Sequence, residues 1–207
     1  MDNQHAQIIF TRLSAAYPQA DTELNYNNLF ELLIAVVLSA QSTDAQVNKV
    51  TEKLFAQVDS PKQLASLPVD EIEQYIKGVG LYRTKAQNIK KIAEILLTKY
   101  NGSVPEDFSA LLSLPGVGRK TANVVWSVGF RRPGLGVDTH VQRLANRIGL
   151  VNTKTPSETE KQLKALFPPA QWTLLHHLLI HHGRKVCKAR QPLCEQCTVA
   201  AECLRRI

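Results

Sequence analysis

Two residues near the middle of the chain have the types and the setting for covalent catalysis. Lys120 directly follows a glycine-rich turn and Arg119, at the start of a helix that the sequence predicts over residues 121–129. The positive end of a helix dipole and a neighbouring cation both lower the pKa of a partly desolvated lysine, and a neutral amine is a nucleophile. Asp138 is the single acid within residues 114–150, so it is the candidate partner that orients the amine or stabilises a cationic intermediate.

A second group of reactive side chains lies at the end of the chain. All four cysteines fall within the last 21 residues, with the spacing C-x6-C-x2-C-x5-C. Four thiols gathered this closely in a chain without a secretory leader indicate one metal centre rather than disulfides. Zinc modules usually pair two short knuckles, and only one occurs here, whereas an iron–sulfur cubane accepts uneven spacing. The pattern favours an iron–sulfur cluster over zinc, with the ligands Cys187, Cys194, Cys197 and Cys203.

The turn before Lys120 has the pattern of a helical hairpin, expected over residues 108–127. A short helix over 107–112 ends before Pro115, and Gly116 and Gly118 give the backbone freedom for a tight turn. The first N–H groups of the following helix can bind a phosphate without reading sequence. An ordinary helical corner with glycines is the alternative. The candidate contact residues are Gly116, Val117, Gly118 and Arg119.

The hairpin, Asp138 and the cysteine spacing together resemble the endonuclease III family of DNA base-excision glycosylases, over nearly the whole chain. The resemblance rests on residues 114–120, on Val137-Asp138-Thr139-His140 and on the cysteines. It implies an all-α fold of two helical domains with a DNA-binding cleft between them. The domains are expected at 22–132, with six helices and the hairpin, and at 1–21 plus 133–207, with a [4Fe–4S] cluster at 187–203.

The family resemblance also implies the activity and the roles of individual residues. Lys120 corresponds to the nucleophile and Asp138 to the second catalytic residue. Gln41 corresponds to a glutamine inserted beside the extruded nucleotide, and Leu81 to a wedge between base pairs, although the sequence alone favours a core position for it. The implied substrates are oxidised pyrimidines in duplex DNA, excised by N-glycosylase action, and abasic sites, nicked by β-elimination through a lysine Schiff base. His140 is expected to contact a phosphate or the damaged base, or to cap a helix.

The distribution of charge agrees with a nucleic-acid partner. The formal net charge is +7, and residues 77–99, 114–150 and 182–207 hold 18 of the 25 Lys and Arg but only 4 of the 18 Asp and Glu. This segregation predicts one basic face for a polyanion, with solvated basic helix faces as the alternative. Lys188 and Arg190 lie in the first cysteine loop, where metal ligands at both ends would limit the entropy cost of presenting them to phosphates.

Composition and hydropathy bound the class of protein. A chain of 207 residues that is 44% hydrophobic can bury one or two cores. We expect a cytoplasmic monomer, nucleoid-associated in a bacterium, because no leader or membrane-spanning apolar run is present. Helical periodicity dominates, so the expected fold class is all-α. Residues 78–89 echo 116–124, which indicates a degenerate repeat of the hairpin. The longest expected helices cover 5–17, 28–38, 90–100, 139–148, 157–166 and 172–183.

Three alternative interpretations compete with these expectations. The spacing of His176, His177, His181 and His182, with pairs four residues apart, could indicate a metal site. A packed helix face is favoured instead, because no acid or cysteine lies near them in sequence. A mismatch adenine glycosylase shares the hairpin but lacks the lysine and carries a glutamate before the glutamine loop, where residues 34–38 have no acid. It also has a further C-terminal domain. A DNA-binding hairpin module without catalysis is disfavoured because Lys120 and Asp138 are both retained.

Overall fold

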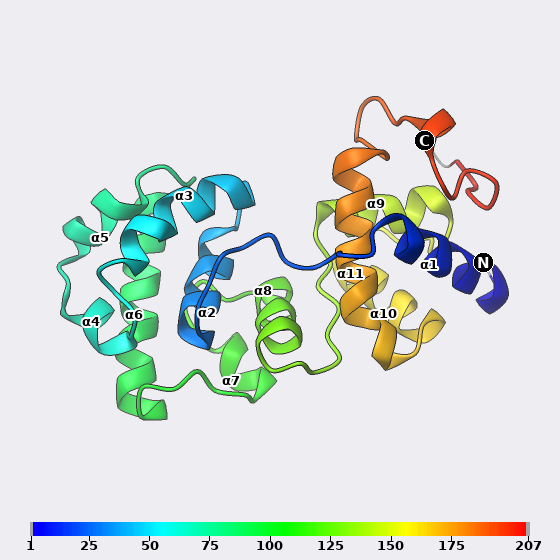
Figure 1. Cartoon of the computed structure of the whole chain (residues 1–207). Coiled ribbons are helices and arrows are strands. Elements are labelled where there is room, and N and C mark those ends of the chain that lie inside the picture. Colours follow the sequence, from blue (N-terminus) through cyan, green and yellow to red (C-terminus); the bar gives the residue numbers. More distant parts are fainter. Residues whose placement is uncertain (1, 206–207) are drawn as a thin grey trace. The chain divides into compact units, whose positions relative to one another are not determined.

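A computed structural model describes residues 2–205, and its regular structure over that range is helical throughout, which confirms the all-α prediction (Figure 1). The chain divides into two compact units. The central unit runs from Glu23 to Arg131. The terminal unit combines the chain up to Thr22 with the chain from Arg132 onward. Within residues 2–205, none of the helices combines the length and the apolar character that crossing a bilayer requires.

The central unit is built around one helix that is apolar on nearly every side, with Glu31 as its one charged residue. Helix α2 begins after Asn28, whose side chain accepts a hydrogen bond from the Glu31 backbone N–H at 2.9 Å. Nine of its ten residues are buried, because α2 packs against α3, α6, α8 and η1. The described elements of this unit are α2 (Leu29–Leu38), α3 (Asp44–Phe55), α4 (Pro61–Ser66), α5 (Val69–Ile76), α6 (Tyr82–Tyr100), α7 (Phe108–Leu112), α8 (Arg119–Val124) and η1 (Val125–Gly129).

The terminal unit has its own core, formed mainly by α1, α9 and α11. A capping box starts α10: Thr155 accepts from the Glu158 backbone N–H at 3.3 Å, and Glu158 accepts from the Thr155 backbone N–H at 3.2 Å. Gly149, at φ +95°, ends α9 in the left-handed conformation. The described elements are α1 (Asn3–Ala16), α9 (Thr139–Ile148), α10 (Pro156–Leu166), α11 (Pro169–Lys185) and η2 (Cys194–Gln196).

The helix predicted over residues 121–129 is wrong in its details. Helix α8 begins two residues earlier, at Arg119, and the chain then widens into the π-helical turn η1 from Val125 to Gly129. The reason lies in packing against α2, because a Cβ added at Gly129 would stand 2.7 Å from Leu29 Cδ2. The wider turn keeps Val125 and Ser127 in the core while the glycine lies directly against α2.

Candidate active site and cysteine cavity

The two glycines of the hairpin have different structural roles. Gly116 has φ +75°, and a Cβ there would stand 2.7 Å from Asn88 Nδ2, so the turn requires glycine. Gly118 has φ −88° and ψ 176°, an extended conformation open to any residue, and a Cβ there would meet nothing within 4 Å. The prediction that both glycines supply turn freedom is therefore wrong for Gly118. The fold itself gives no reason for a glycine at this position.

The hairpin places its two cations side by side at the start of α8. Arg119 is exposed, and its guanidinium carbon lies 5.9 Å from the centre of the Phe108 ring. Lys120, the second residue of α8, is half-buried. The Asn123 side chain donates to the Arg119 carbonyl at 3.0 Å and braces this first turn. Val117 is buried in the core of the central unit, so its side chain packs away from solvent.

Asp138 is fixed by the start of α9 in the terminal unit. Its carboxylate accepts a hydrogen bond from the Val141 backbone N–H at 2.8 Å, so Asp138 is the N-cap and His140 is not. The Asp138 side chain stays half-buried. His140 Nδ1 lies 3.3 Å from Arg143 Nη2, and a Cβ at Gly183 would approach the same nitrogen at 3.2 Å. The His140 side chain on α9 therefore lies against α11 at Gly183.

The two predicted DNA-inserting residues share an unusual backbone conformation. Gln41 has φ +55° and Leu81 has φ +57°. A residue with a Cβ in the left-handed region costs about 1–2 kcal/mol, and such strain persists only where the surroundings enforce it. Both residues are exposed, Leu81 to 61%. The core position that sequence alone favoured for Leu81 is therefore wrong, because its αL backbone points a large apolar side chain into solvent.

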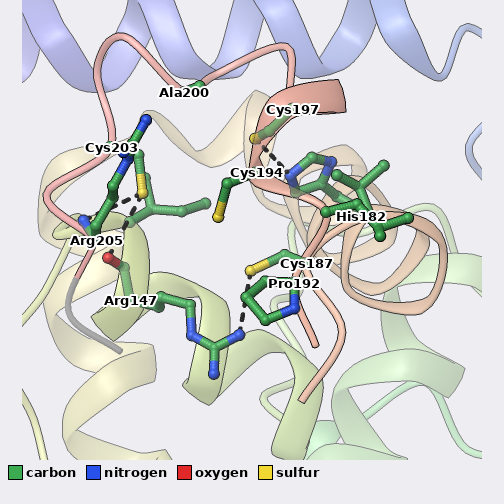
Figure 2. A pocket seen from close by; sticks show the side chains of 12 residues that line it. Arg147, His182, Cys187, Pro192, Cys194, Cys197, Ala200, Cys203 and Arg205 are labelled. Atoms are coloured by element: carbon green, nitrogen blue, oxygen red, sulfur yellow. Dashed lines mark hydrogen bonds between the residues drawn. The ribbon is translucent and has the colours of Figure 1, made fainter. Parts of the chain in front are cut away.

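The four cysteines line one cavity in the terminal unit, as Figure 2 shows. All four are free thiols, and Cys187 is buried while the others are half-buried. Burial raises the pKa of Cys197 and of Cys203. Thiolates here therefore require a compensating positive charge, which a bound metal group supplies as it displaces the protons. Among residues 2–205, no three His, Cys, Asp or Glu side chains are placed to hold one metal ion, so the four thiols line the cavity without converging on a single ion.

Hydrogen-bond donors already face three of the four sulfurs. Arg147 Nη1 lies 3.5 Å from Cys187 Sγ, and the Arg205 backbone N–H donates to Cys203 Sγ at 3.3 Å. Both contacts are drawn in Figure 2. N–H donors of this kind stabilise thiolate ligands of a metal group. The cavity therefore fits a group held by four thiolates.

The third sulfur faces a buried histidine. Burial lowers the pKa of His182 to about 4, so its ring is neutral. Its Nε2 lies 3.3 Å from Cys197 Sγ, and its Nδ1 lies 3.0 Å from the Tyr17 hydroxyl. A thiolate can only accept, so with Cys197 ionised the ring donates through Nε2 and accepts from Tyr17 through Nδ1. Tyr17, the C-cap of α1, thereby fixes the ring that contacts the cysteine.

Two arginines of α9 attach the cysteine loop, and sequence reasoning did not identify them. Arg143 Nη2 donates to the Cys187 carbonyl at 3.1 Å. Arg147 donates to the Lys188 carbonyl at 2.8 Å and to the Ala189 carbonyl at 3.1 Å. The side chains of Lys188 and Arg190 are exposed, as their predicted role requires. The only available sequence signal is that both arginines lie in the basic stretch 114–150.

The histidines of α11 pack within the terminal unit. His176 Nδ1 lies 2.6 Å from the Gly136 carbonyl oxygen, and His181 Nε2 lies 3.2 Å from the Asp21 carbonyl oxygen. His177 is buried, with Nε2 3.7 Å from the Asp21 carboxylate. No acid or cysteine lies near these histidines in sequence, but the fold brings Asp21 to His177 and Cys197 to His182 from distant parts of the chain.

Comparisons with known proteins agree with this fold. The model of the HhH-GPD superfamily base excision DNA repair proteins matches residues 34–169. Endonuclease III of Rickettsia conorii (strain ATCC VR-613 / Malish 7) is 47% identical over 203 residues, 98% of this chain and 97% of that protein. Endonuclease III of Escherichia coli (strain K12) is 47% identical over 195 residues, 94% of this chain and 92% of that protein.

A solved structure extends the likeness to three dimensions. The structure of a trapped endonuclease III–DNA covalent intermediate, an estranged-adenine complex, is 46% identical, with a TM-score of 0.95, and the match covers 99% of this chain and 97% of that chain. The fold and the hairpin thus define a base excision DNA repair protein of the HhH-GPD superfamily. Within that superfamily, the chain belongs to the endonuclease III family and is a DNA N-glycosylase and abasic-site lyase. The predicted family and activity are confirmed.

Proposed function

We propose that the chain excises oxidised pyrimidines from duplex DNA and nicks the resulting abasic site, with Lys120 as nucleophile and Asp138 as the second catalytic residue. The observation that carries this proposal is Lys120 at the start of α8, next to the hairpin turn, in a chain 46% identical to an endonuclease III trapped covalently on DNA. The proposed partner is duplex DNA with damaged pyrimidines or abasic sites, bound by a monomer.

The proposed reaction uses one amine for both chemical steps. Lys120 Nζ attacks the anomeric carbon of the sugar, and the bond to the base breaks with its electron pair leaving on the base. One amine proton passes to the departing base and the other to the ring oxygen as the ring opens. The product is a Schiff base, which acidifies the neighbouring C2′ hydrogen. Removal of that proton expels the 3′ phosphate and leaves a nicked strand. Asp138, held by the Val141 N–H, stabilises positive charge that develops on the sugar.

Several features support the proposed grip on DNA. The open space at Gly118 lets a phosphate approach the backbone N–H groups at the start of α8. Arg119, Lys188 and Arg190 are exposed cations suited to phosphates. Gln41 and Leu81 are exposed and strained, as expected for side chains inserted into the stack, where a wedge offsets part of the unstacking cost of a few kcal/mol. His140 is proposed to contact a phosphate or the damaged base.

The cavity between Cys187 and Cys203 is the proposed site of a [4Fe–4S] cluster with Cys187, Cys194, Cys197 and Cys203 as ligands. A bound cluster would crosslink the loop and supply no step of base removal. The protein's own contribution is the anchoring of the loop. Arg147 holds its backbone at Lys188 and Ala189, and this arrangement presents Lys188 to DNA.

An assay with one defined lesion tests the proposed function. The protein is incubated with a duplex that carries a single thymine glycol opposite adenine, with and without borohydride, and with an undamaged duplex as control. The expected result is a nick at the lesion and, with borohydride, a covalent protein–DNA adduct, both absent from the undamaged duplex. Base release without any trapped adduct would rule out the lysine mechanism. No release from oxidised pyrimidines would rule out the proposed substrate class.

Alanine substitutions at the two glycines of the hairpin distinguish a role in DNA binding from a role in the fold. Gly118→Ala should leave the free energy of unfolding unchanged or raise it by up to about 1 kcal/mol, because its backbone and surroundings accept a Cβ. It should still weaken duplex binding about tenfold, or about 1.4 kcal/mol, because the Cβ occupies the space proposed for a phosphate. Chemical denaturation and fluorescence anisotropy with a labelled abasic-analogue duplex measure the two quantities.

Gly116→Ala is the matched control for this effect. It should destabilise the fold by about 1–2 kcal/mol through its positive φ, with a further cost from the approach to Asn88. A Gly118→Ala protein that binds as tightly as the original would show that no phosphate lies against this glycine.

A further inference from the structure

The loops that carry Gln41 and Leu81 meet within the central unit. Ser42 Oγ accepts a hydrogen bond from the Gly80 backbone N–H at 3.0 Å. A Cβ added at Gly80 would stand 3.0 Å from the Gln41 carbonyl oxygen, which shows how closely the two backbones approach. Each contact residue adjoins one of the strained, exposed residues in sequence. The conformations of Gln41 and Leu81 are therefore set by one shared structure.

A buried lysine completes that structure. Lys85 is 5% exposed, and its ammonium donates to the Leu38 carbonyl at 2.8 Å, to the Ala40 carbonyl at 2.5 Å and to Ser42 Oγ at 3.3 Å. An ammonium group has three donors, so every one is used. We call these contacts of Lys85 with Leu38, Ala40 and Ser42 the lysine tie.

The lysine tie lies at a place in the fold where a buried cation is favourable. Leu38 is the last residue of α2, where carbonyl groups lack partners within the helix and a cation is favourable. Lys85 lies in the first turns of α6, which begins directly after Leu81. The tie thus joins the end of the Gln41-side helix to the start of the Leu81-side helix. Burial lowers the pKa of Lys85, since its three acceptors are uncharged.

We infer that Lys85 is a positioning residue for base extrusion, because its lysine tie holds the Gln41 and Leu81 loops in the relative placement from which both side chains enter the duplex. This inference rests on the proposed role of Gln41 and Leu81. Lys85 touches neither the sugar nor the base in this account. It acts through Ser42 and the two carbonyl groups of the glutamine loop.

The same helix supplies a matched control. Lys90 Nζ donates to the Ala65 and Leu67 carbonyl groups, at 2.7 Å each, between α4 and α5. It is a largely buried lysine on α6 with two backbone carbonyl acceptors, and it also pairs with the Glu94 carboxylate at 3.7 Å. None of these partners belongs to either inserting loop. A general stabilising role predicts similar consequences for Lys85→Met and Lys90→Met. A positioning role predicts a loss of extrusion for Lys85→Met alone.

Base opening gives the direct readout. The full-length protein and both variants are compared by single-turnover excision of thymine glycol, and by the fluorescence of 2-aminopurine opposite the lesion at saturating protein. Lys85→Met should slow excision at least tenfold and reduce the fluorescence rise, while Lys90→Met should change excision by less than twofold. Equal losses in the two variants, or an unchanged rate in Lys85→Met, would overturn the inference.

A protein that already lacks both inserting side chains shows whether Lys85→Met slows excision through positioning or through lost stability. Lys85→Met should cause no further loss of excision in a Gln41→Ala, Leu81→Ala protein, because the side chains it positions are already gone. An undiminished tenfold loss in that background would overturn the inference. Assays are run well below the melting temperature of every variant, so that each protein remains folded.

Hydrogen exchange without DNA separates this inference from the proposed function. Lys85→Met should raise amide exchange in residues 39–42 and 79–82 at least tenfold, while Lys90→Met should not. Faster exchange together with a fully active Gln41→Ala, Leu81→Ala protein would refute the DNA-inserting roles while confirming the tie. Unchanged exchange in Lys85→Met would refute the tie itself, whatever the activity shows.

Discussion

Lys120→Gln is expected to abolish the borohydride-trapped adduct and to lower the rate of base excision by roughly a thousandfold or more, as loss of a covalent nucleophile does in other enzymes. Glutamine keeps much of the length of the side chain but cannot form a Schiff base. Strand nicking should disappear with excision, because both steps use the same amine. Gel analysis of reduced reactions on a thymine glycol duplex measures adduct, excision and nicking together.

The control for this variant is another lysine of the central unit. Lys99 is exposed in the last turn of α6, at the opposite end of that helix from Leu81, so Lys99→Gln should trap and nick as the original protein does. A covalent adduct that persists in Lys120→Gln would show that a different amine is the nucleophile. Duplex affinity should change little in Lys120→Gln, since Arg119 and the hairpin backbone remain.

Retained binding with lost chemistry also separates the alternatives raised by the sequence. A DNA-binding hairpin without catalysis predicts no adduct even before substitution. A mismatch adenine glycosylase predicts base release with no lysine adduct, and residues 34–38 contain no acid for its mechanism. Only a lysine nucleophile predicts an adduct in the original protein and its loss in Lys120→Gln. The variant therefore tests the chemistry itself.

Local sequence signals predicted the helices well, because caps and breaks act over a few residues. Thr139–Ile148 matches its prediction, and the helix expected over 28–38 covers Leu29–Leu38, with Asn28 as its N-cap. The prediction over 121–129 was wrong where a distant helix decided the geometry. Gly129 lies against Leu29, and no local pattern reveals that contact.

The candidate site shows the same division. Its reactive residues have distinctive types and spacing, whereas its supporting residues are identified only by contacts across long stretches of chain. Lys85 bonds carbonyl groups more than forty residues away in sequence. Arg147 reaches the cysteine loop from α9, and His182 reaches Cys197. A buried lysine and an exposed one look identical in sequence, so their roles follow only from burial and partners.

Cys197→Ser is expected to remove most of the iron and visible absorbance of the purified protein, because a serine hydroxyl is a poor substitute for a soft thiolate. The stability of the terminal unit should fall by about 3 kcal/mol, a quarter of the 10–16 kcal/mol that a structural metal supplies in small zinc peptides. The loop should then lose its order between Cys187 and Cys203. Iron and sulfide analysis, absorption spectra and thermal unfolding measure these effects.

Thr198→Ser is the control, since this neighbouring side chain is exposed and its substitution is equally small. It should keep iron, colour and stability. DNA affinity should fall in Cys197→Ser but not in Thr198→Ser, because an unanchored loop presents Lys188 and Arg190 only at an added entropy cost. An original protein that contains one zinc ion and no sulfide would refute the proposed cluster.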